Sequence, residues 1–341
     1  MFTSERELDD RLATPSAALV ADAGRLDGDL VVLGAGGKMG PSLVRLARRA
    51  LDAAGRGSTR VYAVSRWSDD DAARALTDEG VDVVRHDLMD GDDLAALPDA
   101  ANVVFMVGAK FGTSAAPYQA WAVNAALPAA VARRYRDSAI AAFSTGNVYP
   151  LVDLASGGSA EEDPPGPVGE YAMSCLGRER VFEHAAAAYG TRVAILRLNY
   201  AVDLRYGVIA DIAAAVAAGE PVDVTTGHVN VVWQGYANEV ALRSLLHARA
   251  PEAFTLNLTG PETASVRRTA GRIAAALGVE AAFTGRESGT ALLNDASRCH
   301  GLFGYPDVPL DTLIAWQAEW LSRGLPLSGK PTKFAVRDGR F

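Results

Sequence analysis

Short apolar runs alternate with amphipathic segments through the first two-thirds of the chain. Segments with helical spacing, such as 41–55 and 71–80, separate runs that predict buried strands: DLVVLGA (29–35), RVYAVS (60–65), VDVVRH (81–86), NVVFMVG (102–108), AIAAFST (139–145) and RVAILRL (192–198). This alternation is typical of a parallel sheet with helices on both faces. We therefore predict an α/β fold, a doubly wound parallel sheet of the Rossmann type, because crossovers between parallel strands are right-handed.

The two ends of the chain follow other patterns. Ser4 and Glu7 form a capping box, and Thr14-Pro15 is a second helix start, so residues 4–26 should be helical. In the preceding part a long helix is expected at 116–135. Beyond residue 199 we expect helices at 207–219 and 235–248. A strand outside the main series is expected at 228–234, and a strand that returns to the sheet at 253–260. The chain ends in a basic tail, SGKPTKFAVRDGRF (328–341), which is either ordered or disordered.

Charge and composition narrow the classes of ligand and location. The net charge is −8, which argues against non-specific binding to nucleic acid or anionic membranes. No apolar run approaches the roughly 20 residues of a membrane span, and the acidic start does not resemble a secretory signal. Two cysteines fit a reducing compartment, and the histidines lack metal-ligand spacing. We expect a cytoplasmic protein with a small-molecule substrate, no metal, and neither nucleic acid nor membrane as a partner.

A glycine-rich loop joins the first predicted strand to the helix at 41–55. It holds Gly34, Gly37 and Gly40 in a GxxGxxG spacing, with Lys38 and Met39 between the last two glycines. Glycines at these places let the backbone turn tightly and approach a pyrophosphate at a helix N-terminus. The strand–loop–helix context supports a dinucleotide site over an ordinary turn.

The end of the second strand bears on which dinucleotide is bound. NAD sites usually carry an acidic residue there, whereas this chain has Ser65 and Arg66. Arg66 suits a 2′-phosphate, Ser65 can donate to it, and Lys38 is a candidate second cation. The alternative is that Arg66 is a solvated strand-end residue. We expect NADP as the cofactor, with NAD as the alternative.

These features divide the chain into four parts. We expect an N-terminal helical arm (1–28), a dinucleotide-binding domain (29–199, with 236–262 returning to it), a smaller C-terminal substrate-binding region (200–235 and 263–330) and a tail (331–341).

Further motifs resemble the extended short-chain dehydrogenase/reductases, also called the NAD-dependent epimerase/dehydratase family. The resemblance runs from about residue 29 to about residue 322. Its segments are HDLMD (86–90), VFMVGAK (104–110), WAVNAALP (121–128), FSTGNVYP (143–150) and the tyrosine helix EYAMSCLGRER (170–180). The resemblance implies cofactor contacts or support from Asp87, Leu88, Gly108, Ala109 and Asn124.

The resemblance also implies the chemistry. Thr145, with Ser144 beside it, is similar to the catalytic hydroxyl segment, and Tyr171 follows at the family spacing as the proton donor. The implied activity is hydride transfer to or from a sugar-like or other carbonyl/hydroxyl small molecule. Segments that line the pocket in relatives hold Tyr149, Asn199, Arg205, Tyr206, Trp233 and Gln234. The implied assembly is a homodimer through the helices at 116–135 and 169–189, whose outward faces we expect to include Phe182 and Tyr189.

One position departs from the family pattern. Cys175 stands where the family has a lysine that holds the nicotinamide ribose and lowers the pKa of the tyrosine. Without that cation Tyr171 should titrate near its ordinary value of about 10 and act mainly as an acid. Arg178 shares a helix face with Tyr171 and is one candidate substitute, and a reactive rather than packing Cys175 is another. The rival interpretation is a cofactor-binding sensor or interaction protein that has lost turnover.

Overall fold

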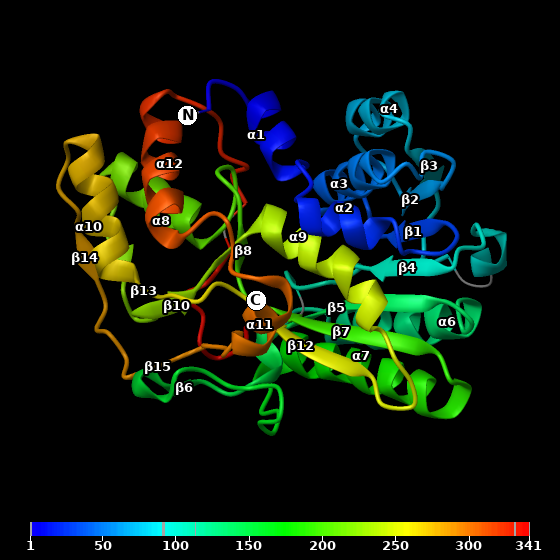
Figure 1. Cartoon of the computed structure of the whole chain (residues 1–341). Helices are drawn as coiled ribbons and strands as arrows, with labels where there is room; N and C mark the ends of the chain where they lie inside the picture. The colour runs from blue at the N-terminus through cyan, green and yellow to red at the C-terminus, as the bar shows by residue number, and fades with distance from the viewer. Residues whose placement is uncertain (1, 91–92, 113, 331, 341) are drawn as a thin grey trace.

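The computed structural model describes residues 2–90, 93–112, 114–330 and 332–340. Its centre is a seven-stranded parallel sheet in the order β12-β7-β5-β4-β1-β2-β3 (Figure 1). The strands are β1 (Leu30–Leu33), β2 (Val61–Ser65), β3 (Asp82–Arg85), β4 (Asn102–Phe105), β5 (Ala139–Thr145), β7 (Arg192–Leu198) and β12 (Phe254–Leu258). The doubly wound fold is confirmed, and so is the return of the late strand, since β12 pairs in parallel with β7.

Helices cover both faces of the sheet. The central strands are apolar on both faces, so each face must be buried. In β1, Leu30 and Val32 pack into one buried layer, and Val31 and Leu33 into the other. The first layer includes α3 (Gly40–Ala53) and α9 (Gln234–Arg243). The second includes α6 (Leu127–Arg134) and α7 (Gly169–Tyr189). This arrangement leaves the carboxyl ends of the strands as the place for a ligand.

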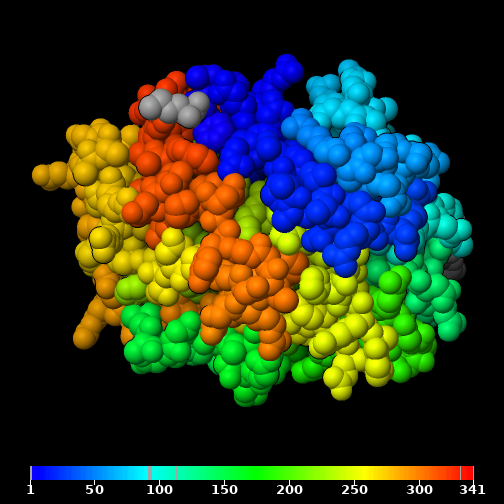
Figure 2. Space-filling model, in the orientation of Figure 1, coloured from blue at the N-terminus to red at the C-terminus, as the bar shows by residue number. Residues whose placement is uncertain are grey.

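Two helices precede the sheet, as expected. They are α1 (Glu5–Leu12) and α2 (Ala17–Ala23). The Ser4 hydroxyl accepts a hydrogen bond from the Glu7 amide at 3.3 Å, but Ser16, not Thr14, caps the second helix. Leu8 on α1 and Leu19 on α2 are buried in the same core layer as α3 and α9. The N-terminal segment (blue in Figure 2) therefore forms part of the packed body, between α12 (Leu310–Ser322) and α3.

The long helix expected at 116–135 is interrupted by a π-helical turn. The segment consists of α5 (Pro117–Trp121), the turn Ala122–Ala126 and α6. Pro128 has no amide hydrogen to donate to the carbonyl of Asn124, four residues earlier, so the regular ladder fails there. That carbonyl accepts instead from Nε of Arg178 at 3.4 Å. The interruption thus links this helix to α7.

The outward faces of α5, α6 and α7 differ from the expected ones. Phe182 is fully buried and meets Phe105 edge-on, with ring centroids 5.5 Å apart. The expectation that Phe182 belongs to an outward apolar patch is therefore wrong. Exposed apolar side chains on these helices are Tyr118, Trp121, Met173 and Tyr189.

The C-terminal region consists of helices and short two-stranded ladders. The helices are α8 (Val208–Ala218), α10 (Val266–Leu277), α11 (Ser297–Phe303) and α12. The expected strand at 228–234 is split into β10 (His228–Asn230), which pairs with β13 (Thr263–Ser265), and β11 (Val232–Trp233), which pairs with β8 (Ala201–Val202). The remaining α-helix and strands are α4 (Asp70–Asp78), β6 (Val152–Asp153), β9 (Val222–Asp223), β14 (Phe283–Thr284) and β15 (Thr290–Ala291), and short 3-10 helices lie at Asp93–Ala96, Gly146–Val148, Leu154–Ser156 and Ser244–His247.

The described part of the tail, 332–340, is packed against the body. The amide and hydroxyl of Thr332 both donate to Asp211 Oδ2, at 2.8 and 2.6 Å. Arg337 donates to the carbonyl of Thr290 at 2.8 Å. Of the two alternatives for the tail, the ordered one holds for residues 332–340. Within the described ranges, the helices all lack the combination of length and apolar character needed to cross a membrane.

Candidate active site

The glycine loop between β1 and α3 fits a bound pyrophosphate. Gly34 has φ +91°, a value that favours glycine, and a Cβ on Gly40 would lie 2.1 Å from the carbonyl oxygen of Ala35. The backbone of α3 therefore packs directly on the loop. In the first turn of α3 the Gly40 amide donates to the Gly37 carbonyl at 3.2 Å, and Pro41 has no amide hydrogen. The Ser42 amide and the positive end of the helix dipole are what this turn offers to an anion. The residues present suit the dinucleotide that the sequence predicts.

The residues expected around the adenosine lie at the same carboxyl edge. Ser65 ends β2 and packs so closely on Gly36 that a Cβ there would lie 2.6 Å from the Ser65 hydroxyl. Arg66 follows and is exposed. After β3, Asp87 is exposed and accepts from the Met89 amide at 3.0 Å, while Leu88 is buried. The exposed guanidinium of Arg66 lies beside this edge and is accessible to a substituent on the adenosine ribose.

Asn124 connects the loop after β4 to α7. From the π-helical turn its side chain accepts from the Ala109 amide and donates to the Ala109 carbonyl, both at 2.9 Å. It also donates to the Ser174 hydroxyl at 3.0 Å. A Cβ on Gly108 would lie 3.2 Å from Nη2 of Arg178, so the loop runs close over this cluster. These bonds fix the backbone at 108–109 relative to the tyrosine helix.

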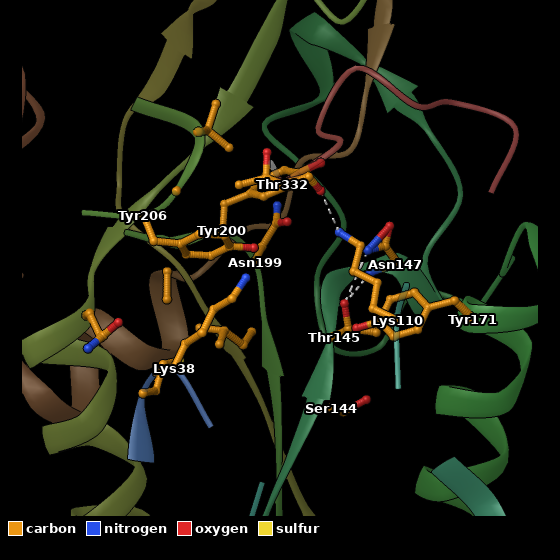
Figure 3. Close-up of a pocket in the computed structure, with 16 residues that line it drawn as sticks. Lys38, Lys110, Ser144, Thr145, Asn147, Tyr171, Asn199, Tyr200, Tyr206 and Thr332 are labelled. Carbon is orange, nitrogen blue, oxygen red and sulfur yellow. Dashed lines mark hydrogen bonds between the residues drawn. The ribbon is translucent and has the colours of Figure 1, made fainter. Parts of the chain in front are cut away.

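One pocket of about 200 Å³ opens at the carboxyl ends of β1, β4 and β5. Figure 3 shows Thr145, Asn147, Lys110 and Tyr171 on one side of it and Lys38, Tyr206 and Tyr200 on the other. The full lining is Lys38, Met39, Lys110, Ser144, Thr145, Asn147, Tyr171, Leu198, Asn199, Tyr200, Ala201, Tyr206, Gly207, Val208, Gln234 and Thr332. The glycine loop, the end of β5 and the tyrosine helix thus meet at a single cavity.

Thr145 and Tyr171 form a hydroxyl pair in this pocket. The Thr145 hydroxyl accepts from the amide and the side chain of Asn147, at 3.2 and 3.3 Å, and is within hydrogen-bonding reach of the Tyr171 hydroxyl. Burial, and then the neighbouring Cys175, raise the pKa of Tyr171 well above its usual value, and the bond to Thr145 and the charge of Arg178 oppose this only in part. Tyr171 is therefore a neutral phenol at physiological pH.

The hydroxyl groups of Ser144 and Tyr149 are both bonded within the protein. The Ser144 hydroxyl donates to Oε1 of Glu179, a buried carboxylate that is paired with Arg197 (Nη2–Oε2 2.8 Å). Although Ser144 borders the pocket, its hydroxyl belongs to this ion-pair network. The Tyr149 hydroxyl accepts from Nη1 of Arg197 at 2.6 Å and donates to Asn257 Oδ1 at 3.0 Å. Both hydroxyls are therefore satisfied within the protein.

Besides Tyr149, two of the expected substrate residues lie outside the pocket. Arg205 binds Asp9 Oδ1 at 2.8 Å and Asp203 Oδ2 at 3.2 Å, so its charge is already compensated. Trp233 is buried against Trp316, with ring centroids 5.7 Å apart, and has no open face for a ligand ring. The pocket does include three of the expected residues: Asn199, Tyr206 and Gln234.

Neither candidate substitute for the missing lysine lines the pocket. Cys175 is buried against Val148 and Tyr149, and burial raises the pKa of its thiol, which favours the packing interpretation. Arg178 is buried too, and its guanidinium donates to the Phe143 carbonyl at 2.7 Å and to Asn124 Oδ1 at 2.8 Å. The charge of Arg178 acts to lower the pKa of Tyr171, although Arg178 does not line the pocket.

Lys110 is the main residue that the sequence interpretation missed. It follows β4, lines the pocket, and its Nζ lies 5.8 Å from the centre of the Tyr171 ring. Nζ also donates to the Thr332 carbonyl at 3.3 Å. Burial, and then the charge of Lys38, lower the pKa of Lys110 to about 8. A signal was present in the sequence, because lysine is rare in this chain.

All the lysines of the chain gather in this region. The chain has 33 Lys and Arg residues, and only four of them are lysines: Lys38, Lys110, Lys330 and Lys333. Lys38 lies with Nζ 3.2 Å from the centre of the Tyr206 ring, and burial, then the charge of Lys330, lower the pKa of Lys38 to about 8. Lys38 therefore faces the pocket rather than joining Arg66, which is not part of its lining. Lys333 acts electrostatically on Lys110.

The sequence of residues 30–251 matches the profile of the NAD dependent epimerase/dehydratase family. The chain belongs to this family. The family assignment confirms the resemblance and the expected class of enzyme. No curated protein matches the chain in sequence.

Solved structures of the family share the fold. MoeE5 in complex with UDP-glucose and NAD is 21% identical, with 87% of this chain and 99% of that chain covered and a TM-score of 0.68. UDP-glucuronic acid 4-epimerase from Bacillus cereus in complex with NAD is 16% identical (86% and 96% covered, TM-score 0.72). UDP-glucose 4-epimerase from Thermotoga maritima with UDP-glucose is 16% identical (87% and 99% covered, TM-score 0.69).

Proposed function

We propose that the protein transfers hydride between a nicotinamide dinucleotide and a carbinol or carbonyl carbon of a sugar-like substrate. The observation that carries the proposal is the Thr145–Tyr171 hydroxyl pair, which shares one pocket with the glycine loop. When bound, the nicotinamide supplies the acceptor or donor of the hydride. Thr145 holds the oxygen on the reacting carbon, and Tyr171 gives that oxygen a proton in reduction or takes its proton in oxidation.

The substrate class is proposed from the chemistry of the pocket and from the relatives. The solved relatives named above are bound to UDP-glucose or act on UDP-sugars. Asn147, Asn199 and Tyr206 offer hydrogen bonds to sugar hydroxyls, and Lys38 offers a positive charge for an anionic group. We therefore assign a nucleotide sugar as the first substrate class to test, and residues 200–235 and 263–330 as the region that binds it.

The cofactor is proposed in two steps. The family and its solved members support NAD or a close relative of it. The finer choice of NADP(H) rests on Ser65 and the exposed Arg66, because that edge offers a cation where a ribose-binding carboxylate would favour NAD.

The alternative function is a cofactor-binding sensor without turnover. Two observations favour it: Cys175 replaces the lysine, and the pKa of Tyr171 is raised. The retained Thr145–Tyr171 pair argues for catalysis, because a protein that only binds the cofactor needs neither hydroxyl.

Turnover of nucleotide sugars tests the proposal. The purified protein is incubated with UDP-glucose or UDP-glucuronic acid and either NAD or NADP, and products are separated by anion-exchange chromatography. We expect conversion by the parent and a rate lowered by roughly 10² or more in Tyr171→Phe, with unchanged cofactor binding. If a substrate is found and Tyr171→Phe and Thr145→Val both turn over as fast as the parent, the hydroxyl pair is not the catalytic machinery. Cofactor binding without any conversion of carbonyl or hydroxyl substrates supports the sensor instead.

A further inference from the structure

The site described above has a hydroxyl pair, and the pocket lining includes no cation from the tyrosine helix. Cys175 is a buried neutral thiol, and the guanidinium of Arg178 is held by Phe143 and Asn124. A tyrosine in this setting strongly resists ionisation, since burial penalises its charged form. The charge of Arg178 opposes this only in part, so a second positive charge from another element would favour proton transfer from Tyr171 or its ionisation.

Lys110 is the residue that reaches this place. Strands β4 and β5 are neighbours in the sheet, so a residue shortly after β4 emerges at the same edge as Thr145. Nζ of Lys110 lies 5.8 Å from the centre of the Tyr171 ring, and its charge also acts on Cys175. Figure 3 shows the Lys110 side chain beside Tyr171 and Thr145, with its nitrogen turned toward Thr332.

We propose that Lys110 supplies, from the loop after β4, the positive charge that the tyrosine helix lacks at position 175. Lys110 is a positioning residue: it acts on the reaction through Tyr171, whose ionised form it stabilises. The inference rests on the proposed function, because it assigns a partner to the same catalytic tyrosine.

The electrostatic surroundings of Lys110 allow this role. It faces Tyr171 and Cys175 on α7, Lys38 on the glycine loop, Asp211 on α8 and Lys333 on the tail. The two other lysines and burial disfavour its charge, while Asp211 favours it. With a pKa of about 8, Lys110 is mostly protonated at pH 7, and ionisation of Tyr171 would hold the proton on it more firmly.

The distance sets the size of the expected effect. Nζ of Lys110 lies 5.8 Å from the centre of the Tyr171 ring, which sets the order of its separation from a charge on that side chain. Two unit charges about 6 Å apart, at an effective dielectric near 20, interact enough to shift a pKa by about 2 units. Removing the charge of Lys110 should therefore raise the apparent pKa of Tyr171 by about 2 units. At a fixed pH below that pKa, this is about a 100-fold loss of the tyrosinate form.

The pH profile of the oxidative reaction tests the role. In Lys110→Met the acid limb should move up by about 2 pH units, and at pH 7 the rate should fall about 100-fold with little change in KM. Lys110→Arg should keep part of the rate. Lys330→Met is the matched control, because Lys330 is an exposed lysine outside the pocket lining whose charge acts on Lys38 and not on Lys110, and its profile should match the parent.

The double variant Lys110→Met/Cys175→Lys moves the positive charge from position 110 to position 175 and so tests whether the two positions can replace each other. It should recover most of the lost rate and return the acid limb toward the parent. An unshifted profile in folded Lys110→Met overturns the inference. If Tyr171→Phe is slow while Lys110→Met is as fast as the parent, the proposed function stands and the role of Lys110 is refuted.

Lysine titration gives a readout that needs no turnover. The chain has only four lysines, so NMR of their isotope-labelled side chains can be assigned by substitution. The Lys110 signal should titrate near pH 8 in the parent. In Cys175→Lys its pKa should fall by about 1 unit or more, because a second ammonium would occupy the same place, while Cys175→Ser should leave it unchanged. An unchanged Lys110 pKa in folded Cys175→Lys contradicts the proposed geometry; if that variant does not fold, the pH profile of Lys110→Met decides.

Discussion

Glu179→Gln is expected to destabilise the protein strongly, because Glu179 compensates a buried guanidinium beneath the hydroxyl pair. Nε of Arg197 lies 3.1 and 3.2 Å from the two carboxylate oxygens of Glu179, and Nη2 lies 2.8 Å from one of them. The two side chains are 5% and 0% exposed. Substitution by glutamine keeps the shape and one acceptor but leaves the positive charge unpaired in the interior.

The magnitude follows from this geometry. Removing one partner of a buried ion pair costs about 3–5 kcal/mol, against about 0–1 kcal/mol for an exposed pair. Arg180, on the same helix, provides the control, because its pair with Glu183 (2.7 Å) is largely exposed. Arg180→Ala should therefore change the free energy of unfolding by less than about 1 kcal/mol.

Urea denaturation followed by tryptophan fluorescence measures both variants. The double variant Glu179→Leu/Arg197→Met should be more stable than Glu179→Gln, since it removes both charges together. If Glu179→Gln unfolds within about 1 kcal/mol of the parent, the interior tolerates the lone guanidinium and the reasoning fails.

Two further predictions concern the cofactor and the assembly. The parent should bind NADPH more tightly than NADH in fluorescence titrations, and Arg66→Ala should reduce the difference by about 10-fold or more, because a charge-assisted bond to the 2′-phosphate is lost; equal affinities in the parent would contradict this. We also expect a homodimer in light scattering, held by the exposed apolar side chains Trp121 and Met173, so that Trp121→Glu gives monomers; a monomeric parent at micromolar concentration rules it out.

The sheet was predictable because its strands carry their signal locally. Runs such as residues 30–33 and 139–143 are apolar at every position, and only a strand covered on both faces needs that pattern. Helix details were less accessible. The π-helical turn depends on how Pro128 frees the Asn124 carbonyl and on Arg178 arriving from another helix, and neither is visible in local spacing.

The site was predictable where motifs and strand ends coincide. Thr145 and Tyr171 meet because β5 and α7 have fixed places in the fold. Trp233 and Arg205 could not be placed in this way, because their partners Trp316 and Asp9 come from distant parts of the chain. Lys110 was missed for the same reason, since its direction depends on the tail that supplies the carbonyl of Thr332.

Lys38 and Lys110 line the pocket, while Lys330 and Lys333 line another cavity and act electrostatically on Lys38 and Lys110. This gathering of all four lysines has a practical consequence for handling the protein. Amine-reactive dyes, crosslinkers and coupling resins act on unprotonated amino groups, and two of these lysines have a pKa of about 8. Apart from the chain's α-amino group, such reagents would meet amines only near the pocket. Amine labelling of this chain should therefore modify lysines at the pocket and block ligand entry. A bound ligand should protect Lys38 and Lys110 from the reagent. Immobilisation through carboxylates or through an added tag leaves the pocket untouched.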